Sequence, residues 1–339
     1  MGVDVFRSFL KLPGGGETTR CFYPLKLDTY GRGCSHNCLY CYARSVLSFR
    51  GLWGDGVAAD FAAIEKTLER AFSGGGGKNG ELLRGRLPVR LGGMTDCFSR
   101  AEREHGVTRR LLTLLNHYRH PYLILTKSAD ITNYLDVIDP DLAYVQLSIT
   151  TLSDDLSAVY EPGASLSSER LAACRALSAA GVYVAGRVNP LFPMYADGHF
   201  SEGKPSPPFN YFHWDLIDAT CEAGAQTLIA GFLRLSQWNI RWIREATGQD
   251  LTWLFDPATK AKNQALHFST EEKRYYYEMI KGRCDAQGVD FSVCYDGDES
   301  YNTFRYLWAN PNDCCNGTGK VPGFTANYAA FGEMIEVQP

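Results

Sequence analysis

The feature that most constrains the fold is a repeated alternation between short apolar runs and helical periodicity. Apolar runs typical of buried strands occur at residues 87–91, 122–126, 143–149, 182–188 and 227–231. Helical stretches separate them, including residues 103–118 and 131–137. Those over 167–180 and 214–223 stop before Gly181 and Gly224, where a glycine commonly ends a helix. The alternation predicts a parallel sheet with right-handed crossovers. Roughly six units fit, fewer than the eight of a closed barrel, so we predict an α/β fold built as a partial (β/α)6 TIM-type barrel.

The same pattern divides the chain into three regions. Residues 1–20 precede the first regular element and form an N-terminal extension. The alternation runs through residues 21–255, which we assign to the barrel. After a helix predicted over 270–284 the alternation is lost, and the remaining residues are rich in tyrosine, asparagine and glycine. We therefore expect residues 256–339 to form a C-terminal extension that caps the barrel.

Charge and hydropathy exclude two broad classes of protein. The 339 residues include 34 lysines and arginines against 38 aspartates and glutamates, a net charge of −4 at pH 7. A general nucleic-acid coat would need a strongly basic surface, although a local basic groove stays open. No apolar run approaches the ~18 residues of a membrane-spanning helix. The first residues lack the basic and apolar regions of a secretion signal, so we expect a cytoplasmic protein without a membrane partner.

Three of the eleven cysteines, Cys34, Cys38 and Cys41, form a tight C-x3-C-x2-C cluster. Three thiolates at this spacing can hold a [4Fe–4S] cluster and leave one iron open for a substrate or cofactor, whereas an electron-transfer cluster takes four. Zinc would need a fourth ligand, and nearby His36 lies inside the tight loop, where its ring is expected to point away. The alternative is three unrelated thiols. The odd cysteine count and the chain length argue against a disulfide scaffold.

The cluster motif resembles that of the radical S-adenosylmethionine (SAM) superfamily. Its flanks are similar to the spore photoproduct lyase-like branch, the DNA repair photolyase-type proteins. The similarity covers about residues 20–255 and includes four further segments. These are Gly92-Gly93-Met94-Thr95-Asp96 with Glu102, Leu125-Thr126-Lys127-Ser128, Val145-Gln146-Leu147-Ser148-Ile149-Thr150-Thr151 with Glu161-Pro162, and Gly231-Phe232-Leu233-Arg234-Leu235.

The resemblance implies an enzyme, its cofactors and its reductant. A [4Fe–4S] cluster on Cys34, Cys38 and Cys41 would reductively cleave SAM, and the resulting 5′-deoxyadenosyl radical would take a hydrogen atom from the substrate. The electron would come from a donor such as flavodoxin or ferredoxin. The positions that match SAM-contacting residues of the family are Tyr40, Gly92, Gly93, Thr95, Asp96, Lys127, Ser148 and Arg187.

Each of these matches has an alternative interpretation. Tyr40 can pack in an ordinary loop, and a pair of glycines after a strand is a common turn. Lys127 can be a solvated loop lysine, although a compact ammonium suits a carboxylate. Arg187 can form a salt bridge with an acid of the core.

Tyr42 and Cys97 match positions with a catalytic role in the lyases. There, a cysteine near the second strand returns a hydrogen atom to the product radical, and tyrosines help to relay it. Cys97 directly follows Asp96, whereas the family places its cysteine a little before that aspartate, so the match is not exact. The alternative for Cys97 is a small buried core residue.

Four cysteines of the C-terminal region, Cys284, Cys294, Cys314 and Cys315, lie outside the similarity. They can hold a second iron–sulfur or zinc site. Their spacing matches no known motif, however, and adjacent cysteines rarely bind one metal, which favours buried thiols.

The substrate suggested by the resemblance is a nucleobase, of thymine origin, in a repair, rearrangement or modification of DNA. The alternative is a radical SAM enzyme that acts on a small molecule, an amino acid or a peptide, because fold and cluster do not determine the substrate. A third possibility is a non-enzymatic binding protein stabilised by metal. Arginines are concentrated in the first third of the chain, where they can line a nucleic-acid groove or simply form solvated helix faces.

Overall fold

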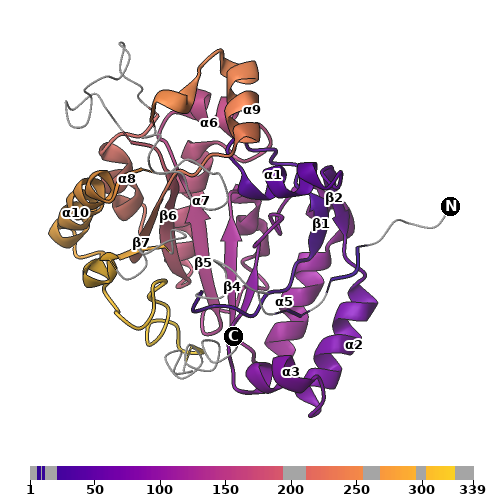
Figure 1. Cartoon of the computed structure of the whole chain (residues 1–339). Helices are drawn as coiled ribbons and strands as arrows, with labels where there is room; N and C mark the ends of the chain where they lie inside the picture. The colour runs from indigo at the N-terminus through magenta and orange to yellow at the C-terminus, as the bar shows by residue number, and fades with distance from the viewer. Residues whose placement is uncertain are drawn as a thin grey trace.

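The computed structural model describes residues 6–8, 10–11, 21–193, 211–254, 268–294 and 303–324. Its centre is a six-stranded parallel sheet in which the spatial order of the strands follows their order in the chain (Figure 1). The strands are β3 (Val89–Leu91), β4 (Tyr122–Thr126), β5 (Ala143–Ser148), β6 (Tyr183–Leu191), β7 (Thr227–Phe232) and β8 (Asp290–Val293). This sequential parallel order, with helical crossovers, confirms the predicted α/β partial barrel.

A short extended segment lengthens the sheet beyond β3. Leu27 N donates to Arg90 O at 3.1 Å and Arg90 N to Leu25 O at 2.8 Å, which makes a parallel bridge between Lys26 and Arg90. The chain then enters β1 (Tyr30–Gly33), which pairs antiparallel with β2 (Asp55–Ala58) in a separate two-stranded sheet. Residues after β1 consequently reach the carboxyl edge of the parallel sheet.

Amphipathic helices cover the sheet. They are α1 (Tyr42–Phe49), α2 (Phe61–Phe72), α3 (Gly77–Arg84), α6 (Asp154–Tyr160), α7 (Ser167–Ala179), α8 (Asp215–Glu222), α9 (Gln237–Thr247) and α10 (Thr270–Ala286). Figure 1 shows α2, α3 and α5 (Val107–His117) packed together on one side of the sheet, with α8 and α10 together on the other. Helix α5, for example, buries an apolar stripe that includes Leu111, Leu112 and Leu115.

The structure differs from the predicted elements in two places. The helix expected over residues 103–118 is two helices, α4 (Arg100–His105) and α5, because Gly106 adopts φ +61°. The buried Glu102 carboxylate accepts hydrogen bonds from Thr108 N and Arg109 N and so caps the start of α5. The helix expected over 131–137 is a short 3-10 helix at Ala129–Tyr134.

The sixth strand, β8, lies within the region that we predicted as a C-terminal extension. Its sequence, Asp290-Phe-Ser-Val293, is short and only half apolar, but it pairs with β7 over all four residues. The later segment 303–324 returns to the opposite end of the sheet, where Gly323 N donates to Asp141 O at 2.6 Å, just before β5. Part of the extension therefore completes the sheet, and part packs against its amino-terminal end.

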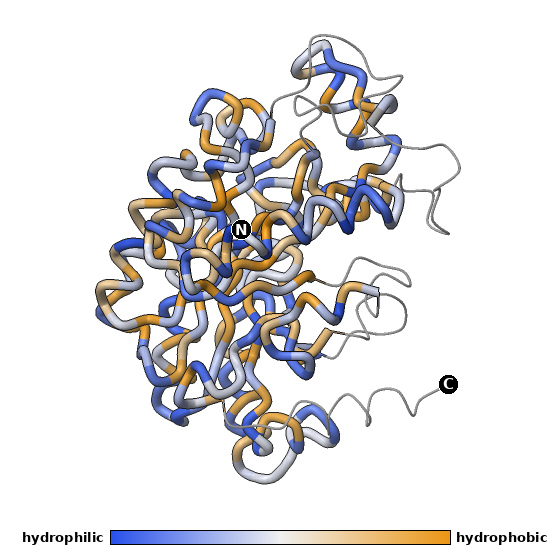
Figure 2. The backbone as a smooth tube through the Cα atoms, turned by 90° about the vertical axis from the view of Figure 1, so that its left-hand side faces the viewer, coloured by the Kyte–Doolittle hydropathy of each residue, from blue (hydrophilic) through white to orange (hydrophobic). Residues whose placement is uncertain are grey.

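Hydropathy along the chain shows no extended apolar element. Figure 2 shows polar and apolar stretches interspersed along the described chain. None of the helices within that portion has both the length and the apolar character required to cross a membrane.

Candidate active site

The cysteine loop begins where β1 ends, and its entry requires a glycine. Gly33 has φ +124°, and a Cβ at this position would lie 1.7 Å from Gly54 O. Thr95 Oγ1 donates to Gly33 O at 2.7 Å and holds the loop from the other side. Within the loop, Asn37 N bonds to Cys34 O and Cys41 N to Cys38 O in successive tight turns. The local backbone thus brings three sulfur atoms into one short loop.

The three thiols suit an iron–sulfur cluster by their chemistry and their surroundings. Cys34 and Cys38 are buried and Cys41 is partly so. Burial raises the pKa of all three thiols, that of Cys34 to about 12, so metal binding would have to release their protons. Among the described residues, no three histidine, cysteine or acidic side chains stand in metal-binding geometry. The structure therefore gathers the thiols in one loop without arranging them around an ion.

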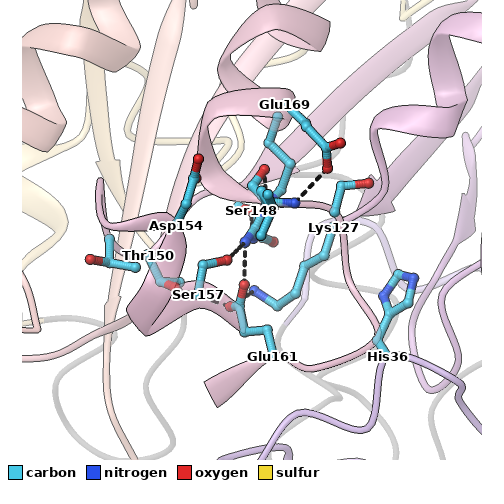
Figure 3. Close-up of polar contacts among 12 residues, drawn as sticks. His36, Lys127, Ser148, Thr150, Asp154, Ser157, Glu161 and Glu169 are labelled. Atoms are coloured by element: carbon cyan, nitrogen blue, oxygen red, sulfur yellow. Dashed lines mark hydrogen bonds and ion pairs between the residues drawn. The ribbon is translucent and has the colours of Figure 1, made fainter. Parts of the chain in front are cut away.

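A buried polar network lies beside the loop (Figure 3). Glu161, directly after α6, is fully buried and accepts hydrogen bonds from Tyr40 Oη, Thr150 Oγ1 and Arg170 Nη2. Lys127 Nζ forms an ion pair with Glu161 Oε1 at 3.1 Å and lies 5.5 Å from the centre of the Tyr40 ring. The network connects the ends of α6, α7 and β4 to the cysteine loop.

Lys127 shares the Glu161 carboxylate, its ion-pair partner, with Arg170. Arg170 already neutralises Glu161, and the Lys127 ammonium, although ion-paired, donates no hydrogen bond within the described chain. Burial lowers the pKa of Lys127 to about 7. An anionic group bound beside Cys38 would supply the missing partner. The residues present therefore fit a cluster with thiolate ligands and the carboxylate of SAM.

Asp96 joins three segments at this edge of the sheet. Its carboxylate accepts hydrogen bonds from Thr126 Oγ1 at 2.8 Å and from Lys127 N at 2.7 Å, at the end of β4. His36 Nδ1 lies 3.4 Å from Asp96 Oδ2, and burial lowers the pKa of His36, which keeps the imidazole neutral. His36 thus faces Asp96, and the expectation that its ring turns away from the cysteines stays a prediction.

The glycine pair after β3 makes a close approach to the neighbouring strand. Gly92 has φ +79°, and a Cβ would lie 2.1 Å from Leu125 O. Gly93 O accepts a hydrogen bond from Tyr42 Oη at 2.5 Å, while the Tyr42 side chain remains 60% exposed. The aromatic ring of Tyr42 is therefore available to a bound molecule at the carboxyl edge of the sheet.

Two further predicted residues occupy paired positions on β5 and β6. Ser148 and Arg187 are register partners, and the Ser148 carbonyl accepts a hydrogen bond from Arg170 Nη1. Arg187 Nη1 donates to Gln146 Oε1, and its Nη2 donates to Cys294 Sγ, both at 2.9 Å. Arg187 thus contacts an amide and a thiol.

Tyr42 and Cys97 have different surroundings in the structure. Cys97 is 1% exposed and lies in the core, and its carbonyl accepts a hydrogen bond from Thr108 Oγ1. No hydrogen bond between the two residues is present in the described structure. A hydrogen-atom relay through this pair needs a change of conformation or an intervening group, and the role of each residue stays a prediction.

Three residues that support the loop were not predicted from the sequence. Arg170 is fully buried on α7, and a lone arginine among the apolar positions of that helix was the available signal. Asn239 Nδ2, on α9, donates to Leu39 O and Cys41 O. Gly163 fits beneath Ser35, since a Cβ would lie 1.9 Å from Ser35 O.

A cavity of about 720 Å³ adjoins the cysteine loop. Ser35, His36, Gly163 and Arg103 are among the residues that line it, together with part of α7. None of the three cluster cysteines is among its lining residues.

The other cysteines form two groups. Cys284, on α10, is a neighbour of Cys221 on α8, which raises the pKa of Cys284. Cys294, Cys314 and Cys315 instead interact with one another and with Cys21. Of the four C-terminal cysteines, Cys284 is therefore placed apart from the other three.

Several arginines of the first third have structural partners. Arg100, Arg103 and Arg109 form ion pairs with Asp55, Asp130 and Asp136. Arg44 lies over the Trp242 ring at 4.1 Å. These contacts leave the nucleic-acid groove a prediction.

Comparison with known proteins identifies the fold. No family model matches the chain. An uncharacterized protein of Mycobacterium tuberculosis and one of Mycobacterium bovis are each 30% identical over 173 residues, which is 49% of this chain and 49% of each relative. The chain therefore spans about half the length of the curated relatives it matches.

Solved structures of spore photoproduct lyase are similar over most of the chain. One variant superposes with a TM-score of 0.62 at 14% identity, covering 85% of this chain and 80% of the other. Another, with bound AdoMet and dinucleoside spore photoproduct, gives a TM-score of 0.60 at 15% identity, covering 85% and 79%. The chain thus has the fold of spore photoproduct lyase, in agreement with the family that its motifs resemble.

Proposed function

We propose that this protein is a radical SAM enzyme that abstracts a hydrogen atom from a nucleobase of thymine origin. The reaction would be of the lyase or isomerase type and would repair, rearrange or modify DNA. The alternative substrate is a small molecule, an amino acid or a peptide. The donor of the electron would be a flavodoxin- or ferredoxin-type protein.

One observation carries the proposal. The C-x3-C-x2-C loop lies at the carboxyl edge of a partial barrel, next to a buried lysine whose carboxylate partner is shared with Arg170 and whose ammonium donates no hydrogen bond within the described chain. Active sites of barrel folds are built at this edge. A [4Fe–4S] cluster bound here would supply the electron that cleaves SAM to the 5′-deoxyadenosyl radical.

The residues around the loop have distinct tasks in this proposal. Lys127 would hold the SAM carboxylate, and Ser148 would contact the ribose at the end of β5. Asp96 fixes the backbone of Lys127, and Glu161 fixes the side chains of Lys127 and Tyr40. Positioning of this kind is the main contribution that a protein makes to cofactor chemistry.

The nucleobase is supported by a similarity and by an exposed aromatic ring. The spore photoproduct lyase of similar fold was solved with a dinucleoside photoproduct. Tyr42 offers a largely exposed ring at the same edge of the sheet as the cysteine loop, and aromatic faces stack on extruded bases.

The test is SAM cleavage by anaerobically purified, dithionite-reduced protein, with 5′-deoxyadenosine quantified. We expect cleavage by the wild type and none by the Cys34→Ala/Cys38→Ala/Cys41→Ala variant. Cys174→Ala, a buried cysteine of α7 away from the loop, is the matched control and should retain activity. Candidate thymine lesions and modified bases are then screened for stimulation, beside a metabolite extract.

No cleavage by a fully loaded and reduced cluster, with or without a DNA digest or metabolite extract, would refute the enzyme. It would favour the metal-stabilised binding protein instead. Stimulation by the metabolite extract alone would select the small-molecule alternative.

A further inference from the structure

We propose that Lys26, Arg90 and Arg187, here called the basic cluster, form an anion site on the inner face of the sheet. The site would bind a phosphate or carboxylate group of the substrate. That assignment to the substrate rests on the proposed function, whereas the anion site itself rests on the contacts described below.

Arg187 identifies the inner face. It lies on β6, yet its guanidinium reaches Gln146 on β5 and Cys294, which directly follows β8. Strand β7 lies between β6 and β8, so this side chain crosses a neighbouring strand on one face of the sheet. In a partial barrel, a single side chain can bridge strands in this way on the concave face.

Arg90 and Lys26 approach the same region from the edge of the sheet. A Cβ on Gly93 would lie 3.8 Å from Lys26 Cδ and 3.9 Å from Arg90 Nη2. Gly93 also accepts the hydrogen bond from Tyr42, so both cations lie directly beside the proposed active site. The charges of Arg90 and Arg187 act on each other and on Tyr42.

The three cations of the basic cluster outnumber the acids beside them. Asp28 is the acid in this region, since its Oδ1 lies 3.8 Å from the same Gly93 Cβ position as the side chains of Lys26 and Arg90. No described carboxylate forms an ion pair with any member of the basic cluster, and the other oxygen of Asp28 pairs with Lys11 at 3.0 Å. Arg90 Nη1 instead lies 3.3 Å from Cys21 Sγ. The excess of positive charge favours an anion and disfavours a metal cation.

Unpartnered donors point to the same ligand. Within the described chain, Arg90 Nε and Gln146 Nε2 are shielded from solvent and donate no hydrogen bond, and the Gln146 side chain is fully buried. Buried polar atoms nearly always have a partner. Guanidinium and amide donors match the oxygens of a phosphate or a carboxylate.

The test is calorimetric titration of the cluster-loaded protein with inorganic phosphate and, separately, with succinate, under anaerobic conditions without reductant. We expect saturable binding of at least one anion, and Arg187→Gln should weaken it about tenfold through the loss of a charged donor. Arg187→Lys should retain part of the affinity. Arg100→Gln, which removes an exposed arginine paired with Asp55, is the matched control and should bind as the wild type does.

Circular dichroism and the melting temperature establish that each variant is folded. Binding of phosphate alone would assign a phosphorylated substrate, and binding of succinate alone a carboxylate. The anion site is refuted if neither anion binds, or if Arg187→Gln and Arg90→Gln both bind like the wild type. If saturating SAM prevents the anion from binding, the basic cluster binds the cofactor, and the assignment of an anion site to the substrate is refuted.

The two proposals fail separately. A protein that binds the anion but never cleaves SAM would refute the enzyme and leave the anion site standing. A protein that cleaves SAM but binds neither anion would support the enzyme and refute the anion site.

Discussion

At the scale of single residues, the candidate site depends on buried polar groups that neutralise one another. Glu161 and Arg170 are both fully buried and bound to each other, and Lys127 adds a second cation to the same carboxylate. A buried pair of this kind contributes little net stability, but breaking it leaves an uncompensated charge. Its role here is to hold the side chains next to the cysteine loop in place.

Removing Arg170 should therefore be costly. We expect Arg170→Leu to lower the free energy of unfolding by about 3–5 kcal/mol, because Ser148 O, Ser157 Oγ and Glu161 Oε2 all lose a buried donor, even though Lys127 still offsets the Glu161 charge. Arg100→Leu, which breaks an exposed ion pair, should cost no more than about 1 kcal/mol. Denaturant unfolding measures the free energy of unfolding of both variants. Equal losses would show that the buried pair contributes no more to stability than the exposed pair.

Gly92 and Gly181 provide a matched pair of glycines. Their φ angles are +79° and +80°, but a Cβ at Gly92 would meet Leu125 O at 2.1 Å, whereas nothing lies within 4 Å at Gly181. Gly181→Ala should cost about 1–2 kcal/mol of backbone strain, and Gly92→Ala clearly more, because the strands must also move apart. Chemical denaturation gives both values, and similar losses would contradict the close approach of the Gly92 turn to β4.

At the scale of elements, α9 fastens the cysteine loop. Asn239 at its amino end donates to Leu39 O and Cys41 O and accepts from Ser45 Oγ on α1. These bonds connect residues nearly 200 positions apart in the sequence, so the loop is held by a helix that follows β7.

Loss of this clamp should affect the cluster more than the fold. We expect Asn239→Ala to cost about 1–3 kcal/mol through unpaired buried groups, and to lower the iron and sulfide retained per chain after reconstitution. Asn133→Ala, on the 3-10 helix Ala129–Tyr134, is the control and should retain iron as the wild type does. Full iron retention by Asn239→Ala would show that the hydrogen bonds from Asn239 are not needed to hold the cluster.

Local signals explain which elements were predictable. Strand β4 was predicted at its exact bounds because its five residues are a continuous β-prone run between Pro121 and Lys127. The cysteine loop was equally clear, since its spacing is local. Strand β8 was missed because Asp290 and Ser292 break its apolar pattern, and only pairing with β7 makes it a strand.

Contacts between segments that are distant in the sequence could not be predicted from local sequence patterns. Cys21 and Cys294 are separated by most of the chain, and nothing in either local sequence indicates that both face the basic cluster. Arg170 could be singled out as a charge on an apolar helix face, but its partner Glu161 could not be identified from that pattern. Long-range packing therefore decides the inner surface of the site.

At the scale of the whole molecule, the C-terminal segment ties both ends of the described chain together. Asp313 is fully buried, and Tyr23 Oη donates to its Oδ2 at 2.6 Å. The same oxygen accepts hydrogen bonds from Gly317 N and Thr318 N. Unfolding of this segment would expose Tyr23 together with the amino-terminal end of the sheet, so we expect one cooperative transition.

The stability of this unit should fall in mild acid because of His120. Its ring is buried beside Phe72, with Nε2 3.0 Å from Leu87 O, and burial lowers the pKa of His120 to about 4. Between about pH 6.5 and 4 the unfolded chain therefore binds a proton that the folded chain does not. The contribution of the neutral His120 to the free energy of unfolding is present in full above pH 6.5. It is lost as the pH falls, up to about 3 kcal/mol.

His120→Gln removes the titration, so the difference between its unfolding free energy and that of the wild type should change by about 3 kcal/mol from pH 7.5 to 4. His105→Gln, at an exposed position of α4, should follow the wild-type curve. Parallel curves for His120→Gln and the wild type would show that the ring is protonated without unfolding.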